Sequence, residues 1–235
     1  EVDLLTLYML SLKRRELPGP YLPKDRLRVE KFGEREFAAD GQTVFGAFCS
    51  GCHGSQGQGR RAPGRNTFHA ISNPDFLSLV SDGFITETVI QGRPGRKMPA
   101  WGRKDGGLNR GEIDQAVARL REIGGIAPRS DPKPPRWVSA DAAAGERLFA
   151  SACASCHGSN GQGGEGPALN NPVLLDNATD TFFFETVSRG RRGTVMEGYL
   201  NPSSARPALV SEEIEEIIAY VRSWEGEKKC ERAVR

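Results

Sequence analysis

The sequence has few histidines, few methionines and no long apolar run. Its 235 residues include three histidines, three methionines and five cysteines. The longest apolar candidate, residues 4–12, is too short for a membrane span, which needs roughly 18 residues. A formal net charge of +2 shows no large excess of one sign, and this disfavours a nucleic-acid-binding protein. The sequence therefore predicts neither a membrane span nor a nucleic-acid partner.

Side chains able to fill a hydrophobic core are also scarce. The apolar fraction is 37%, and the chain contains 28 glycines and 15 prolines. Small domains with so little core material usually need a disulfide, a metal or a cofactor. Length and an internal duplication together favour two domains, so we expect a bound group to complete the core of each.

Four of the five cysteines belong to a motif that occurs twice. Residues 49–53 read CSGCH and are followed by GSQGQG, while residues 153–157 read CASCH and are followed by GSNGQG. Cys-x-x-Cys-His is the attachment sequence of c-type haem. Two thiols one helical turn apart add across the two vinyl groups of a porphyrin, and the histidine reaches the iron. The motif thus predicts two haem c groups, attached through Cys49, Cys52, His53, Cys153, Cys156 and His157.

Zinc binding and thiol–disulfide exchange also use Cys-x-x-Cys. A zinc site would require the two pairs to share one metal, yet each pair lies in its own complete repeat. Neither alternative accounts for a methionine at a matched position in both repeats. The fifth cysteine, Cys230, lies in a charged C-terminal stretch and is interpreted as an exposed free thiol, with an intermolecular bridge as the alternative.

The duplication extends well beyond the cysteines. Upstream, Gly-x-x-x-Phe occurs at residues 41–45 and again at residues 145–149, and Pro63 matches Pro167 at the same offset. After a six-residue shortening of the second copy, residues 87–98 match residues 185–196, which aligns the two methionines. Each copy closes with a helix whose apolar residues recur at i, i+3, i+4 and i+7. Those residues are Ile113, Ala116, Val117 and Leu120, and Ile214, Ile217, Ile218 and Val221.

These patterns predict the organisation of the chain. The first domain is expected at residues 35–127 and the second at 139–229, with a proline-rich linker at 128–138 and a tail at 230–235. The first twelve residues resemble residues 213–224. We therefore interpret residues 1–16 as the closing helix of a preceding domain, with an ordinary amphipathic helix as the alternative, and residues 17–34 as a linker.

Each repeat resembles a class I cytochrome c domain: an N-terminal helix with Gly-x-x-x-Phe, the haem attachment motif, a loop proline, a methionine and a closing helix. The resemblance implies a mainly α fold, a small helical bundle around one covalently attached haem in each domain. It implies iron ligation by His53 with Met98, in the sequence MPAWG, and by His157 with Met196, in MEGY. The family's remaining haem contacts correspond here to Pro63, Pro167, Trp101, Tyr199, Arg93 and Arg191.

In that family the loop proline carbonyl accepts a hydrogen bond from the ligating histidine, which suits Pro63 and Pro167. Trp101 and Tyr199 are expected at the haem edge, with simple core packing as the compatible alternative. The arginines pair with haem propionates or are merely solvated.

Three further features of the sequence lead to predictions about burial, helix packing and surface charge. His69 is the one histidine outside the motifs, and it is interpreted as a surface residue, with replacement of Met98 as iron ligand as the alternative. Arg119 stands where the second repeat has Tyr220, so the first closing helix is expected to pack less tightly on the helix that contains Phe45. A basic rim near Met98 could steer an acidic partner or be ordinary solvated surface; it comprises Arg93, Arg96, Lys97, Arg103 and Lys104.

With histidine and methionine on both sides, an iron has no open position and can only change its oxidation state. The sequence thus predicts an electron carrier that is not an enzyme by itself and has no catalytic residues. Expected partners are redox proteins, including subunits of a quinol-oxidising complex, a photosynthetic reaction centre or a membrane-bound dehydrogenase. The alternative is a diheme enzyme, peroxidase-like or thiosulfate-oxidising. Haem c attachment indicates the bacterial periplasm or the outer face of the cytoplasmic membrane.

Overall fold

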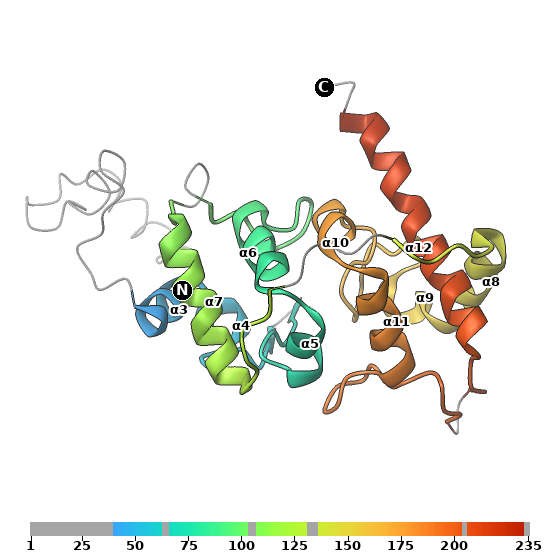
Figure 1. Cartoon of the computed structure of the whole chain (residues 1–235), viewed down its shortest axis with the longest axis horizontal. Coiled ribbons are helices and arrows are strands. Elements are labelled where there is room, and N and C mark those ends of the chain that lie inside the picture. The colour runs from blue at the N-terminus through green and yellow to red at the C-terminus, as the bar shows by residue number, and fades with distance from the viewer. Residues whose placement is uncertain (1–39, 63–65, 103–106, 131–135, 204–205, 233–235) are drawn as a thin grey trace, which may run out of the picture. The chain divides into compact units, whose positions relative to one another are not determined.

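A computed structural model describes residues 40–62, 66–102, 107–130, 136–203 and 206–232, all within one compact unit, Asp40–Arg235. The predicted helix at 1–16 and linker at 17–34 lie outside the described residues. The described part is mainly helical, as predicted, with a two-stranded sheet (Figure 1). Within these residues, no helix is both long and apolar enough to cross a membrane.

The helices of the first repeat recur in the same order in the second. Residues that start the equivalent helices also recur: Asn73 and Asn171 cap α5 and α10 through their side chains, and a proline follows each. The first repeat contains α3 (Gly41–Phe48), α4 (Ser50–His53), α5 (Pro74–Leu79), α6 (Asp82–Gln91) and α7 (Arg110–Gly124). The second contains α8 (Ala142–Ala152), α9 (Ala154–His157), α10 (Pro172–Asn177), α11 (Asp180–Arg189) and α12 (Ser211–Arg232).

Each repeat packs its first helix against its closing helix, α3 against α7 and α8 against α12 (Figure 1). The eight apolar residues predicted for the closing helices are all buried. A capping box between Asn109 and Glu112 starts α7. The first helix of each repeat has a glycine where it crosses the closing helix, which lets the two backbones approach closely. A Cβ on Gly41 would lie 2.5 Å from Gln115 O, and a Cβ on Gly145 would lie 1.9 Å from Glu216 O.

The two crossings differ in their aromatic packing. In the second repeat the Phe149 ring lies 5.5 Å from Tyr220 and 5.4 Å from Trp224, between centroids. In the first repeat Arg119 replaces the tyrosine and forms an ion pair with Glu122 of the same helix at 3.0 Å. The closing helix α7 therefore packs without the aromatic cluster that holds α12.

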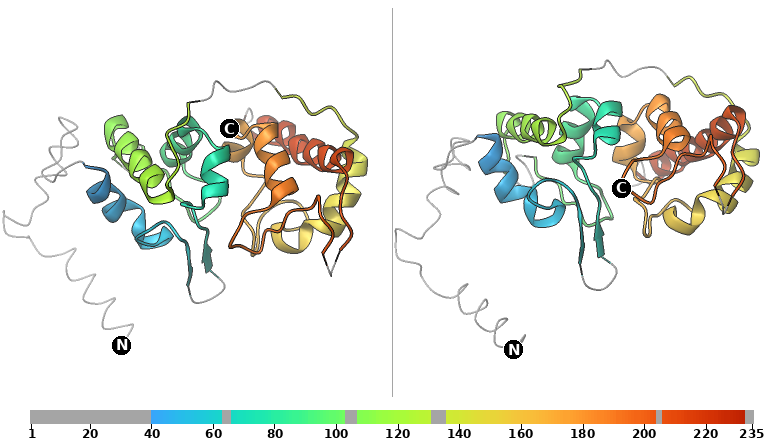
Figure 2. Two further views of the ribbon diagram at one scale, coloured as in Figure 1. Left: turned by 60° about the horizontal axis from the view of Figure 1, so that its bottom comes forward. Right: turned by 90° about the horizontal axis from the view of Figure 1, so that it is seen from below.

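The first repeat carries a β-hairpin that the second lacks. Strand β1 (Arg60–Ala62) pairs antiparallel with β2 (Asn66–Phe68), and Figure 2 shows the two strands extending away from the helices. After the hairpin, the amides of Ile71 and Ser72 donate to Gly57 O, just as those of residues 169 and 170 donate to Gly161 O. The hairpin therefore replaces residues 164–166 of the second repeat, and the residue equivalent to Pro167 is His69.

A buried arginine ties each closing helix to the two helices before it. Arg121 of α7 donates to the Asp82 carboxylate at 2.7 Å and to the carbonyls of Leu77 and Val80. The second repeat contains the same network, in which Arg222 of α12 donates to Asp180, Leu175 and Ala178. These two arginines fix the position of the closing helices, and the sequence analysis did not identify them.

Candidate functional site

Both Cys-x-x-Cys-His motifs form a single turn of helix directly after the first helix of the repeat. Cys49 ends α3, and its carbonyl accepts from the amide of His53 at 3.0 Å; Cys153 and His157 repeat this contact at 3.0 Å. Each turn ends at a glycine with positive φ, Gly54 at 82° and Gly158 at 81°. The turn places both cysteines and the histidine of each motif close together, as attachment to one porphyrin requires.

The Nδ1–H group of each motif histidine donates to a backbone carbonyl. His157 donates to Pro167 O at 2.8 Å, as the sequence predicted. His53 donates to His69 O at 3.0 Å, so the predicted acceptor, Pro63, is wrong. The hairpin is the reason, because its strands add residues before the acceptor, so His69 and not Pro63 is equivalent to Pro167. Pro63 itself lies outside the described residues.

These hydrogen bonds fix the tautomer of both imidazoles. With the proton on Nδ1, the lone pair of Nε2 is free to bind a metal. Burial lowers the pKa of His53 and of His157, and the hydrogen bonds to the carbonyls oppose this effect only in part. Both rings are therefore neutral at pH 7, the form in which histidine ligates iron.

The first thiol of each motif is not activated. Burial raises the pKa of Cys49 to about 11 and that of Cys153 to about 12, and the second cysteine of each motif adds to the effect. Reactive exchange cysteines have lowered pKa values instead. No three His, Cys, Asp or Glu side chains in the described residues gather into a metal-ion cluster. The two competing interpretations, thiol–disulfide exchange and zinc, are therefore disfavoured.

The methionines lie on matching loops. Met98 and Met196 are half-buried, and their carbonyls accept from the amides of Arg93 at 2.9 Å and Arg191 at 2.7 Å. Each loop begins at a glycine, of which Gly190 has φ of 70° and approaches Met196 O so closely that a Cβ would lie 2.4 Å away. Met98 and Met196 therefore occupy equivalent positions in the two repeats, and their ligation of iron stays a prediction.

Two buried guanidinium groups next to these loops have N–H groups without partners. Arg93 Nη1 and Arg191 Nε are buried and have no hydrogen-bond partner within the described residues. Burial lowers the pKa of each to about 10, so both remain positively charged at pH 7. Burial and, second, the charge of Arg191 lower the pKa of His69, and the same charge adds to the effect of burial on the pKa of His157. Unpaired buried cations of this kind fit an anionic group such as a haem propionate.

The two aromatic residues after the methionines occupy equivalent positions but make different contacts. Trp101 packs edge-to-face on Phe48, with centroids 5.4 Å apart. The Tyr199 hydroxyl donates to Ala152 O at 2.7 Å, directly before Cys153, and Arg206 lies over its ring at 3.6 Å from the centroid. Since that hydroxyl already has a protein acceptor, the structure supports packing beside the motif for Tyr199.

The basic rim near Met98 is only partly available to a partner. Arg93 is half-buried, and Arg96 donates to Asn170 Oδ1 of the second repeat at 3.3 Å. Arg103 and Lys104 lie outside the described residues. His69, predicted on the surface, is half-buried, and its backbone carbonyl supports His53.

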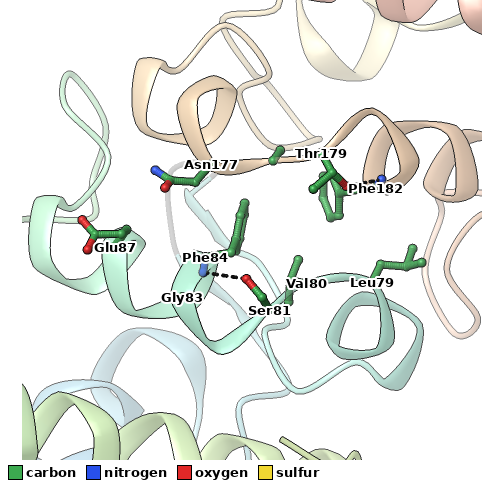
Figure 3. A pocket seen from close by; sticks show the side chains of 10 residues that line it. Leu79, Val80, Ser81, Gly83, Phe84, Glu87, Asn177, Thr179 and Phe182 are labelled. Atoms are coloured by element: carbon green, nitrogen blue, oxygen red, sulfur yellow. Dashed lines mark hydrogen bonds between the residues drawn. The ribbon is translucent and has the colours of Figure 1, made fainter. Parts of the chain in front are cut away.

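The two repeats contact each other through equivalent residues. Asn73 Nδ2 donates to Arg192 O at 3.0 Å, and its equivalent Asn171 donates to Pro94 O at 3.1 Å. Phe84 and its equivalent Phe182 face each other with centroids 5.7 Å apart, in a pocket lined by both repeats (Figure 3). An additional contact is one-sided: the Arg192 side chain and amide both bind the Asp75 carboxylate, at 2.6 and 2.7 Å.

We expect Asp75→Asn to destabilise the chain in a pH-dependent way. Hydrogen bonds from Arg192 lower the pKa of Asp75 below its ordinary value of 3.8. The ion pair therefore stabilises the folded state above that pH, and its contribution is lost as the pH falls through the lower folded pKa. Because both side chains reach solvent, the cost at pH 7 should not exceed about 1 kcal/mol.

Urea unfolding of wild type and Asp75→Asn at a series of pH values measures this difference. Asp114→Asn is the matched control, since Asp114 pairs with Arg110 on the exposed face of α7 and should change little at any pH. A difference for Asp75→Asn that persists unchanged below pH 3 would contradict the assignment to this ion pair.

Family models match both repeats. The model for cytochrome c covers residues 142–225, and the model for cytochrome c oxidase, cbb3-type, subunit III covers residues 36–118. Among curated proteins, the chain is 32% identical to the cbb3-type cytochrome c oxidase subunit FixP of Bradyrhizobium diazoefficiens, with 81% of this chain and 62% of that protein aligned. It is 28% identical to subunit CcoP of Rhodobacter capsulatus, over 79% of this chain and 62% of the relative.

The chain thus spans about three fifths of the length of these curated relatives. Among solved structures, cytochrome cL of Methylophaga aminisulfidivorans is 37% identical over 35% of this chain and 51% of that protein, with a TM-score of 0.28. The doubled motif, the doubled helical framework and the matching models lead to one assignment. The chain belongs to the class I cytochrome c family, as a diheme member that attaches one haem c in each of two domains.

Proposed function

We propose that this chain relays single electrons between redox partners through its two haem sites and catalyses no reaction by itself. The observation that carries the proposal is the matched placement, in each repeat, of the two residues that we propose as iron ligands. A neutral histidine, fixed through Nδ1, is paired along the chain with a methionine on an equivalent loop. His53 with Met98 and His157 with Met196 would hold the two irons, and neither iron would then offer a site to oxygen, peroxide or another substrate.

Some residues of the chain would attach the haems, and others would set their reduction potentials. When bound, each haem c supplies an Fe(III)/Fe(II) couple that takes up one electron. The motif cysteines would anchor the porphyrin, and the carbonyls of His69 and Pro167 orient the histidines that would hold the iron and raise their basicity. The thioethers of Met98 and Met196 would favour the ferrous state. Arg93 and Arg191 would hold anionic propionates with their unpartnered N–H groups.

We further infer that the chain serves as the diheme subunit of a cbb3-type oxidase. The model that matches residues 36–118 describes a subunit of that oxidase, and the curated relatives carry the same description. Among the complexes predicted from the sequence, this is the setting that the similarities favour. The haem domains would then lie in the periplasm or at the outer face of the cytoplasmic membrane, in contact with other subunits.

Haem stoichiometry and axial ligation test the relay. We expect a pyridine haemochrome assay to give two covalent haems per chain, and the oxidised spectrum to show a methionine-to-iron charge-transfer band. Met98→Ala and Met196→Ala should each remove about half of that band, because each opens one iron. Wild-type protein with high-spin iron, or with peroxidase turnover before any methionine is replaced, would instead establish the enzyme alternative.

Exchange of the matching region tests the oxidase setting. The aligned part of Bradyrhizobium FixP is replaced by this chain, and oxygen consumption by the resulting oxidase is measured with a reduced soluble donor. We expect consumption well above that of an oxidase with the same region deleted. Consumption equal to the deletion, despite two haems per chain, would refute membership of this complex while leaving the relay intact.

A further inference from the structure

The contact between the repeats has approximate two-fold symmetry. The hydrogen bond from Asn73 to Arg192 O has its counterpart in that from Asn171 to Pro94 O, and the two partners of the Phe84–Phe182 pair are equivalent to each other. In an isologous contact, each surface patch meets its own equivalent. Residues near the symmetry axis in one domain are therefore near the other domain as well.

Arg191 lies in this contact and faces aromatic rings of both domains. Its guanidinium carbon is 5.6 Å from the centroid of Phe182 in its own domain and 5.0 Å from that of Phe76 in the first domain. Cations over aromatic faces at such distances are held electrostatically. Although it follows the second attachment motif in sequence, Arg191 thus sits between helices α5 and α11 of the two domains.

Its equivalent, Arg93, does not make the reciprocal contact. Arg93 lies over Phe84 at 5.6 Å and donates to Thr88, both in its own domain. The position equivalent to Phe76 is Leu174, which has no aromatic face to offer. Of these two equivalent arginines, Arg191 therefore contacts aromatic rings of both domains, whereas Arg93 contacts a ring of the first domain alone.

The loop that carries Arg191 is also fixed from the first domain. Its neighbour Arg192 binds the Asp75 carboxylate through the backbone amide and the side chain, and Asp75 precedes Phe76 in α5. The equivalent positions, Val173 and Pro94, cannot form an ion pair. The bonds between Arg192 and Asp75 thus hold the guanidinium of Arg191 close to the ring of Phe76.

We propose that Arg191 is a shared electrostatic element that raises the reduction potentials of both haems, whereas Arg93 acts on the first haem alone. A buried positive charge disfavours the additional positive charge of ferric iron, and low dielectric extends this effect across the domain contact. The inference rests on the proposed function only in requiring two bound haems, since a potential is an equilibrium property of the isolated protein.

Potentiometric titration of the full haem-loaded chain tests the proposal. Two midpoint potentials are measured and assigned with Met98→His, which changes the spectrum of the first haem alone. We expect Arg191→Gln to lower both midpoints and Arg93→Gln to lower only the first. Arg191→Lys keeps the positive charge and should leave both midpoints close to those of wild type. If Arg191 acted only through its packing, the shorter list of contacts that lysine can make would shift the midpoints as well.

Phe76→Leu provides a second, milder variant, because it introduces the residue that the second domain has at this position. It should lower the first midpoint and leave the second unchanged. The proposal is overturned if Arg191→Gln shifts only the second midpoint, or if Arg191→Gln and Arg93→Gln shift the same single haem. If both midpoints respond to the variants as expected but the chain passes no electrons to a cbb3-type oxidase, the proposed oxidase setting is refuted and this inference stands.

Discussion

Arg121→Met is expected to lower the free energy of unfolding by about 3 kcal/mol, the lower end of the range for removing one partner of a buried ion pair, because Asp82 is 34% exposed. The Arg121 side chain is only 2% exposed and donates to Asp82 and to two buried carbonyls. Methionine fills similar space but leaves these acceptors without their donor. We expect Arg222→Met to have a comparable cost, because Asp180 is 1% exposed.

Guanidinium unfolding of the haem-loaded chain, followed by far-ultraviolet circular dichroism, measures the loss. Arg119→Met is the matched control on the same helix, since Arg119 pairs with the exposed Glu122. Its effect should stay within about 1 kcal/mol. Equal losses for Arg119→Met and Arg121→Met would show that the buried network adds nothing beyond a surface ion pair.

Gly145→Ala should destabilise the second domain by about 3 kcal/mol, at the upper end of the range for overpacking. The added methyl group would lie 1.9 Å from Glu216 O and 2.4 Å from the carbonyl carbon of the same residue. Both atoms belong to the backbone of α12, so the contact is relieved only if α8 and α12 move apart. Because α8 leads directly into Cys153, we also expect a lower yield of covalently attached haem.

The control for this variant is Gly46→Ala in the equivalent helix of the first repeat. A Cβ on Gly46 would have no neighbour within 4 Å, so alanine should be neutral or raise stability by up to about 1 kcal/mol through helix propensity. Chemical unfolding compares the two variants, and pyridine haemochrome analysis counts their haems. Unchanged stability of Gly145→Ala would mean that the helix crossing is looser than this geometry requires.

Features carried by short sequence patterns were predictable. The motifs at 49–53 and 153–157 specify their own one-turn helices, and the spacing of Ile113, Ala116 and Val117 specifies a buried helix face. Such signals depend on residues a few positions apart, so they can be read without knowledge of the rest of the fold.

The acceptor of the His53 hydrogen bond was mispredicted because two prolines shared an offset. The first repeat is six residues longer than the second, and Pro63 aligns with Pro167 only if the extra residues follow Pro63. The hairpin shows that the extra residues lie before His69, so His69 takes the matching position. Only the backbone hydrogen bonds of the folded chain identify the acceptor, since a carbonyl acceptor requires no particular side chain. The carbonyl of any residue at that point would serve.

The contact between the domains could not be predicted from the sequence. The asparagines at 73 and 171 indicate helix caps, and their side-chain amides reach the other repeat only because the folded domains face each other. The same holds for Arg191, whose contact with Phe76 joins residues far apart in sequence. The interpretation of residues 1–16 as a closing helix remains a prediction outside the described residues.

The reciprocal asparagine contacts have a consequence for the origin of the chain. A patch that recognises its own equivalent would also allow two separate copies of one such domain to associate as a homodimer. Gene duplication and fusion would then join an existing pair, and later changes could differ between the halves. The ion pair of Asp75 with Arg192, which has no counterpart across the axis, is the kind of change that becomes accessible only after fusion, when each half evolves separately.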